Sequence, residues 1–330
     1  MKESIDPEGS FLEALPPEAP SADPPEFRWR ESNSQRRRSL AIALSLFLLT
    51  VLSTLTVGAQ LAASYSAGRA PDIDDFFASY ADLIQQPQLL FTGVPYAFTL
   101  LGILLAHELG HFFACRYYGI SASYPYFIPA PTLLGTLGAF IRIRSPIYHR
   151  RALFDVGLAG PVVGFLFAIP ALAIAVAYSR VIPFSGQQAP VLFGNPLALH
   201  LLVAALRPGV TATELLLNPV GRAAWAGLFA TALNLIPGGQ LDGGHILYAV
   251  TSKYHRRITF GVALLLFPLG YLFWAGWYLW AVLLLAIGFR HPPLLYGWES
   301  LDRRRLVWTG VAVLMFILCF MPIPVHILLD

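Results

Sequence analysis

Charged residues are scarce in this sequence. Only 12% of its 330 residues are Asp, Glu, Lys or Arg, and 56% are hydrophobic, whereas soluble domains carry about 25% charged residues. The length alone would suggest about two soluble domains, but so little charge means that most of the chain does not face water. The composition therefore predicts one polytopic membrane domain.

Cysteine is scarce too. The two cysteines, Cys115 and Cys319, lie inside or beside apolar stretches, which excludes a disulfide framework and a cysteine-rich zinc module. The net charge of +3 is too small to indicate a nucleic-acid partner, so we expect none.

Residues 1–38 differ from the rest of the chain because they are rich in Pro and Glu and lack apolar periodicity. Such a segment cannot bury enough apolar surface to offset the entropy of ordering it. It is also too long and too acidic to be the start of a signal peptide. We therefore expect a disordered tail at 1–38, followed by a membrane domain at 39–330.

Long uncharged stretches predict the membrane helices, because a helix needs about 20 apolar residues to cross a bilayer. The stretch at 258–289 is too long for one span, and Pro268, Gly270 and Gly276 offer a break, so we expect a tight pair of helices there. The expected fold class is a membrane all-α bundle of about seven transmembrane helices. The spans are 40–63, 91–117, 156–179, 223–236, the pair within 258–289, and 306–320.

The basic residues are divided unevenly between the two sides of this layout. Most of the 22 Lys and Arg residues lie on one side of the membrane, in the tail and in the loops at 116–151, 253–257 and 290–305. Because cytoplasmic loops are enriched in Lys and Arg, we expect an integral, multi-pass protein with a cytoplasmic N-terminus. The other side contains only Arg69, Arg180, Arg207 and Arg222.

Two apolar stretches do not fit as spans. Residues 181–206 are interrupted by prolines and glycines, so we interpret them as an external loop at the membrane surface. Residues 125–145 contain a glycine-rich turn followed by alternating apolar and polar residues, a pattern that predicts strand. Open strands are tolerated in a bilayer only where protein or water covers them. We therefore expect a small, covered β segment associated with the membrane.

A cluster of ionisable residues, His107-Glu108-Leu109-Gly110-His111, lies within the expected second span. Residues four apart share a helix face, so His107 and His111 can present imidazole nitrogens to one metal ion. Zinc with three protein ligands keeps one position for water and lowers the pKa of that water to about 7. Glu108 could then take a proton as the water attacks a peptide carbonyl and deliver it to the leaving amine. The alternative, an ordinary polar helix face, is costly within a bilayer.

The third ligand is expected in the sequence Leu-Asp-Gly-Gly-His at 241–245. Asp242 is the only acidic residue between Glu214 and Glu299, and its glycine neighbours let the backbone approach a metal closely. We therefore expect Asp242 to complete the site, the alternative being an aspartate that caps a helix. His245 is the alternative third ligand. If it does not bind the metal, it is a residue that supports one of the ligands or an ordinary histidine at the membrane interface.

These motifs resemble those of the site-2 proteases, which are intramembrane zinc endopeptidases. The resemblance runs from about residue 91 to residue 254, the expected catalytic core, and its motifs keep the family's order and spacing. The segments 135–140, 145–146 and 151–155 look like the branch without a PDZ domain, known from plastids, cyanobacteria and other bacteria. The shared motifs are HELGH at 107–111, Gly160-Pro161 with Gly164, Asn-x-x-Pro at 234–237 and LDGGH at 241–245.

The resemblance implies zinc as the cofactor, held by His107, His111 and Asp242, with Glu108 as the catalytic acid and base. It also implies that Asn234 lies near the substrate or the developing oxyanion, where an amide donor stabilises negative charge.

The resemblance further implies transmembrane protein substrates within the lipid bilayer of a bacterial plasma membrane or a plastid-type membrane. An unwound substrate could add as a strand to the edge of the β segment. Gly135 and Gly138 are therefore candidate substrate-binding residues.

Two other functions fit parts of the sequence. Intramembrane His and Asp residues also mark ion pathways, so a metal-ion transporter is one alternative, but transporters usually contain internal repeats and this sequence shows none. A catalytically inactive membrane chaperone or scaffold is the other, and the intact Glu108 argues against it. The sequence indicates neither the substrate nor the oligomeric state.

Overall fold

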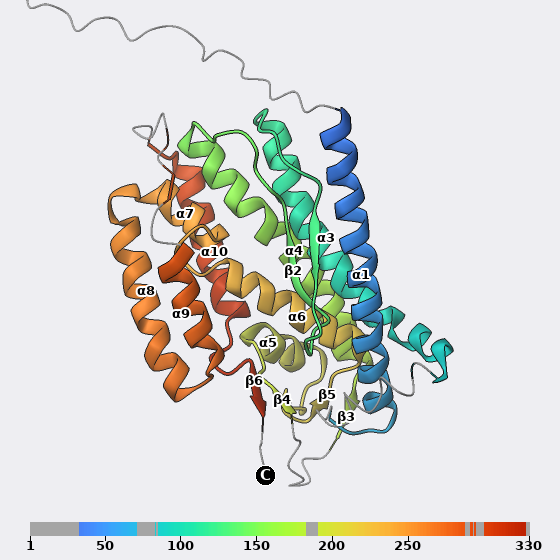
Figure 1. The fold of residues 1–330 in the computed structure, drawn as a ribbon. Helices are drawn as coiled ribbons and strands as arrows, with labels where there is room; N and C mark the ends of the chain where they lie inside the picture. The colour runs from blue at the N-terminus through green and yellow to red at the C-terminus, as the bar shows by residue number, and fades with distance from the viewer. Residues whose placement is uncertain are drawn as a thin grey trace, which may run out of the picture.

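The computed structural model describes residues 33–70, 83, 85–182, 191–287, 291–292, 294 and 300–327, and within these the chain is mostly helical (Figure 1). Residues 1–32 of the expected tail lie outside the described residues. The first helix, α1 (Asn33–Ser66), begins within the basic end of that tail, earlier than the span expected from residue 40. Residues 33–38 contain no Pro or Gly, and arginine favours helix, so the helix extends back through them.

Short strands and turns separate the other helices. In the described residues the elements after α1 are η1 (Pro87–Gly93), α3 (Val94–Tyr117), β1 (Tyr126–Pro129), β2 (Thr136–Phe140), α4 (Arg150–Tyr178), β3 (Arg180–Val181), β4 (Val191–Phe193), α5 (Leu197–Leu206), β5 (Leu215–Leu216), α6 (Pro219–Asn234), α7 (Asp242–Val250), α8 (Ser252–Leu272), α9 (Gly276–Ile287), α10 (Arg303–Cys319) and β6 (Val325–Ile327).

Three helical segments among the described residues are long and apolar enough to cross a membrane: Arg37–Ser66, Pro87–Tyr117 and Arg150–Tyr178. They correspond to the first three expected spans. α6, the expected fourth, has 16 residues, or about 24 Å at 1.5 Å per residue, which is short of a hydrocarbon core of about 30 Å. The structure therefore supports three candidate spans, and a bundle of about seven remains a prediction.

The long apolar stretch at 258–289 is broken as expected. α8 ends at Leu272 and α9 begins at Gly276, and the two helices pack against each other. They lie at the opposite edge of the view from α1 (Figure 1).

α1 has the polarity of a helix that faces lipid. Its fully buried positions include Thr50 and Thr54, whereas Leu48 and Leu52 are 65% and 53% exposed. Both threonine hydroxyls donate to carbonyls one turn back in α1, so they are satisfied without water. In a bilayer small polar residues favour helix contacts and leucine faces the acyl chains, which explains this inverted arrangement.

The expected β segment is present and covered. β1 and β2 pair as an antiparallel hairpin, which lies along α1 (Figure 1). The Ser39 hydroxyl of α1 lies 2.6 Å from the Tyr126 hydroxyl of β1, and the Ser53 hydroxyl of α1 donates to the Gly135 carbonyl at 2.6 Å. The first span thus shields one side of the hairpin.

The interpretation of 181–206 as a loop was wrong in part, because it contains α5. Residues 183–190 lie outside the described residues. After Pro196, which serves as the N-cap of α5, ten residues run without Pro or Gly, and the buried side chains Ala198, Leu199 and Val203 anchor the helix. Tertiary burial of this apolar face outweighs the helix-breaking residues that precede it.

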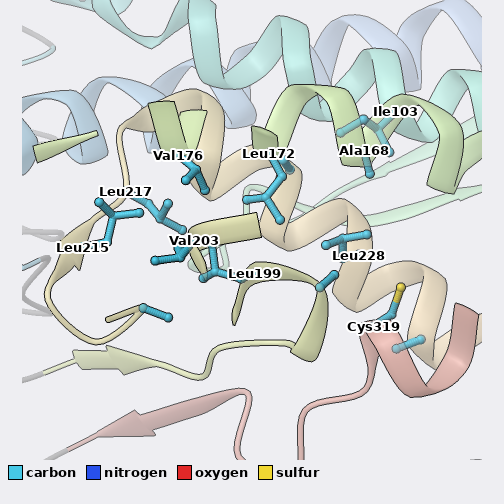
Figure 2. Close-up of a cluster of buried hydrophobic side chains, with 14 residues drawn as sticks. Ile103, Ala168, Leu172, Val176, Leu199, Val203, Leu215, Leu217, Leu228 and Cys319 are labelled. Carbon is cyan, nitrogen blue, oxygen red and sulfur yellow. The ribbon is translucent and has the colours of Figure 1, made fainter. Parts of the chain in front are cut away.

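α5 closes the largest buried cluster. Figure 2 shows Leu199 and Val203 of α5 facing Leu172 of α4 and Leu228 of α6, with Cys319 of α10 at one end. α4 is the central element of the fold, since it packs against α3, α6 and α7. These contacts bring the histidine-bearing helix α3 and the start of α7 to the same helix.

Candidate metal centre

Three side chains from α3 and α7 converge. His107 Nε2 and His111 Nε2 are 3.1 Å apart, and Asp242 Oδ2 lies 3.2 Å from the first and 3.3 Å from the second. The two histidines are one turn apart on α3, and Asp242 is the first residue of α7. This is the one group of three or more possible metal-ligand side chains among the described residues.

The donor set fits zinc. Zinc–ligand bonds of 2.0–2.2 Å in a tetrahedron separate neighbouring ligand atoms by about 3.3–3.6 Å, and the three distances of this triangle lie at or just below the short end of that range. Two imidazoles and one carboxylate leave one position for water, as in catalytic rather than structural zinc sites. His107 and His111 are 5% and 7% exposed, so few water molecules compete for the ligands.

The tautomer of His111 is fixed by α4. Its Nδ1 lies 2.7 Å from the Val156 carbonyl oxygen, and because a carbonyl can only accept, Nδ1 carries the proton. Nε2 therefore keeps its lone pair for a metal, which is the usual role of a carbonyl behind a metal-ligating histidine.

Gly160 and Gly164 of α4 make room for the two histidine rings. A Cβ atom at Gly160 would lie 2.1 Å from His111 Nε2, and one at Gly164 would lie 3.0 Å from His107 Nδ1. Glycine at 160 is thus required by the close approach of the ring rather than by backbone conformation. These two small residues therefore allow α4 to pack closely against α3 and also leave space for the histidine rings.

Glu108 lies beside the ligands on the next position of α3 and is 5% exposed. Its carboxyl group lies near the backbone N–H of Ile141 and interacts electrostatically with it and with His107, His111 and Asp242. Ile141 directly follows β2. The hairpin therefore ends at the carboxylate next to the metal ligands.

Asn234, the last residue of α6, also borders the group. Its Nδ2 lies 3.3 Å from His107 Nε2. A side-chain amide of α6 thus borders the metal ligands beside His107, a position that the sequence motif implied only by analogy.

The loop that carries Asp242 is held by α8. Gly239 has a φ of +63°, which L residues rarely adopt, and both of its backbone polar groups bind side chains of α8. Its N–H donates to the Thr259 hydroxyl at 3.3 Å, and its carbonyl accepts from His255 Nε2 at 3.2 Å. Thr259 and His255 are 0% and 2% exposed, so α8 fixes this turn from within the protein.

His245, the rival ligand, is not part of the group. Its Nδ1 lies 2.9 Å from His291 Nε2, one helical turn beyond Asp242. Asp242 is the third member of the group, as expected from the sequence.

The two candidate substrate-binding glycines lie in the β1–β2 hairpin. Gly135 has a φ of +76° in the turn, and it packs against Ser53 and Thr54 of α1. Gly138 has a φ of +101° in β2, and a Cβ there would meet open space. Gly135 is thus a packing position, whereas Gly138 leaves free space beside the strand that leads to Glu108.

Sequence reasoning missed the backbone groups of the site. The Val156 carbonyl and the Ile141 N–H have no side-chain signature, so no sequence motif identifies them. His255 could have been suspected as a histidine close to the motif at 241–245, but Thr259 gave no signal.

Comparison with known proteins places the chain in a family. Residues 95–273 match the model of peptidase family M50, the site-2 protease family. The chain belongs to peptidase family M50. The match covers both histidines, Glu108 and Asp242, and it confirms the resemblance seen in the motifs.

Two curated relatives of this M50 chain are plant proteins. It is 32% identical to the "Probable zinc metalloprotease EGY1, chloroplastic" of Arabidopsis thaliana, over 86% of this chain and 53% of that protein. It is 34% identical to the Arabidopsis "Probable zinc metalloprotease EGY2, chloroplastic", over 60% of this chain and 36% of that protein. The chain thus spans about half or less of the length of these relatives. Among solved structures there is no significant match.

Proposed function

We propose that this protein is an intramembrane zinc endopeptidase that hydrolyses peptide bonds in or near transmembrane segments of membrane proteins. The observation that carries the proposal is Glu108 beside three metal ligands, within a helix that is long and apolar enough to cross a membrane. Zinc bound by these ligands would polarise water and lower its pKa to about 7.

In this proposal Glu108 and Asn234 perform the proton and charge chemistry. The carboxylate oxygens of Glu108 take a proton from the attacking water and pass it to the leaving amine nitrogen. The Nδ2 of Asn234 donates to the carbonyl oxygen of the scissile bond as negative charge develops there. The Ile141 N–H orients the Glu108 carboxylate between these events.

β2 offers an edge along which an unwound substrate can pair. Leu137 is 69% exposed and has no partner in the β1–β2 register, and Gly138 adds no side chain that would block an approaching backbone. A peptide bound as a strand along β2 would be led toward Ile141 and Glu108. Leu137→Pro should slow cleavage, since proline removes an N–H, whereas Leu137→Ala keeps the backbone and serves as the control. Equal cleavage by both variants would remove β2 from the substrate path.

The membrane setting is part of the proposal. Seven spans with a cytoplasmic N-terminus account for the distribution of basic residues. The chloroplastic relatives support a plastid-type membrane, and a bacterial plasma membrane has the same physical requirements. The substrates are other membrane proteins, and they reach the ligands through the lipid bilayer.

The test is a comparison of wild-type protein with Glu108→Gln, a change that keeps shape but removes the base. Membrane proteomes of cells expressing each form should differ by truncated membrane proteins that appear only with wild type, while both purified proteins contain zinc. Glu214→Gln, at a half-buried glutamate that is not one of the metal ligands, is the matched control and should behave as wild type.

Three results would contradict the proposed function. Full cleavage activity in Glu108→Gln would reject the mechanism. Zinc uptake into vesicles that depends on the purified protein, without proteolysis, would indicate a metal transporter; zinc binding with neither activity would indicate a scaffold.

A further inference from the structure

A second pair of histidines lies next to the metal centre. His245, in the second turn of α7, and His291, which follows α9, point ring nitrogens at each other, with Nδ1 and Nε2 2.9 Å apart. This separation is close to the 3.1 Å between the Nε2 atoms of His107 and His111. Neither histidine has a role in the reaction proposed above.

The ring of His291 is held as a metal ligand would be. Its Nδ1 lies 2.8 Å from the Pro292 carbonyl oxygen, which can only accept, so Nδ1 carries the proton and Nε2 keeps its lone pair. The same arrangement, Nδ1–H to a carbonyl with Nε2 free, prepares His111, and it is usual behind metal-ligating histidines. The His291 ring also stacks on Tyr248, with centroids 4.0 Å apart and planes 18° from parallel, which fixes its orientation.

Both imidazoles are neutral at pH 7. Burial and the neighbouring His291 lower the pKa of His245 to about 4. Burial likewise lowers the pKa of His291. Because a neutral imidazole is the form that binds metal, both rings can offer a lone pair without first losing a proton to solvent.

We propose that His245 and His291 bind a second, exchangeable divalent transition-metal ion, of the class that prefers imidazole nitrogen, with Zn²⁺ as the physiological example. The ion replaces the hydrogen bond between the rings. It binds Nε2 of His291 and Nδ1 of His245, whose proton moves to its own Nε2, so no net proton is released. Among the described residues the pair belongs to no group of three ligands, so water completes the coordination and the ion binds more weakly than at a three-ligand site.

His255 is close to the pair but serves another purpose. Its ring centroid lies 5.7 Å from that of His291, and its Nε2 donates to the Gly239 carbonyl. It holds the loop that carries Asp242 and leaves the second ion with two imidazole ligands.

The test is a zinc titration of the full-length protein, purified without a histidine tag and stripped with a chelator. Equilibrium dialysis against increasing free Zn²⁺, with bound zinc measured by mass spectrometry, should give wild type one tight and one weaker equivalent. His291→Ala should lose the weaker equivalent and keep the tight one. His200→Ala, which removes an exposed histidine of α5, should bind as wild type does.

A variant of the first site separates this proposal from the proposed function. His107→Asn/His111→Asn should lose the tight equivalent and keep the weaker one, and Cu²⁺ bound to it should show couplings to two imidazole nitrogens by electron paramagnetic resonance. A wild-type protein that binds one equivalent throughout, or a His291→Ala variant that still binds two, would overturn the second site. Unchanged tight binding in the double variant would instead overturn the proposed catalytic centre.

Discussion

The molecule contains two histidine pairs whose ring nitrogens are about equally close, and the pairs differ in their surroundings. His107 and His111 are joined by the Asp242 carboxylate and have Glu108 beside them. His245 and His291 have a carbonyl and an aromatic ring behind them but no carboxylate ligand among the described residues. Two imidazoles are therefore sufficient for a weak metal site, whereas a catalytic metal site also needs a carboxylate as the third ligand and a general base beside the ligands.

Removal of the Asp242 carboxylate is expected to have the largest effect on the difference between the two pairs. Asp242→Ala should make the first pair resemble the second and lower its zinc affinity by more than about 100-fold, beyond the 10–100-fold typical of residues behind the ligands. Cleavage should disappear with the zinc. Competition with a chromophoric chelator measures the affinity, and Glu214→Ala is the control that removes a half-buried acid outside the ligand group. Tight zinc binding in Asp242→Ala would mean that another residue is the third ligand.

Crowding one ring of the first pair should have the next largest effect. In Gly160→Ala the new Cβ would lie 2.1 Å from His111 Nε2, so the ring must move off the metal. We expect zinc affinity to fall by about 10–100-fold, with a parallel fall in cleavage. Gly102→Ala on α3 has open space for its Cβ and should change neither quantity. Equal affinities in the two variants would contradict the packing of His111 against α4.

The support of the Asp242 loop by α8 gives a smaller effect. Thr259→Val leaves the Gly239 N–H without its acceptor, and an unsatisfied buried donor costs about 1–3 kcal/mol. Part of that cost should appear as zinc affinity weakened by about 3–10-fold, while Thr259→Ser restores it. Thr309→Val, which removes a hydroxyl that donates to a carbonyl of its own helix, is the control. Zinc titration measures the affinity of all three variants. Equal zinc affinities in Thr259→Val and Thr259→Ser would show that the Thr259 hydroxyl does not support the Asp242 loop.

The smallest effect is expected where neither pair is touched. The Tyr118 hydroxyl donates to Asp155, which also accepts from Arg305 Nε at 2.8 Å, so this contact ties α3 and α4 to α10. Tyr118→Phe should lower the free energy of unfolding by about 1 kcal/mol and leave both zinc affinities unchanged. Thermal unfolding together with the zinc titration tests it. A change in zinc affinity would show that the ligand triangle depends on packing far from the two pairs.

The difference between the pairs also shows what a sequence can reveal. His107 and His111 are four residues apart on one helix, so helical periodicity alone brings them together. Asp242 was found by its rarity and by its glycine neighbours. His291 is 46 residues from His245, and only the tertiary fold joins them, so no local pattern could predict that pair.

The parts of the fold that have a local sequence pattern were also predictable, and the parts that depend on tertiary packing were not. Long apolar runs identified α1, α3 and α4, and Pro and Gly identified the break between α8 and α9. α5 was missed because prolines and glycines dominate the segment around it, and its stability comes from burial against α4 and α6. The start of α1 at Asn33 was missed because polar residues without breakers carry little signal.

The most direct test of the metal centre is the zinc X-ray absorption spectrum of tag-free His291→Ala loaded with one equivalent of zinc. That variant removes the proposed weaker site, so the spectrum reports the first site alone. The account predicts four nitrogen or oxygen ligands, of which two are imidazoles, and an Asp242→Ala/His291→Ala sample that fails to retain the zinc. A spectrum with sulfur ligands, or with fewer or more than two imidazoles, would contradict a zinc held by His107, His111 and Asp242.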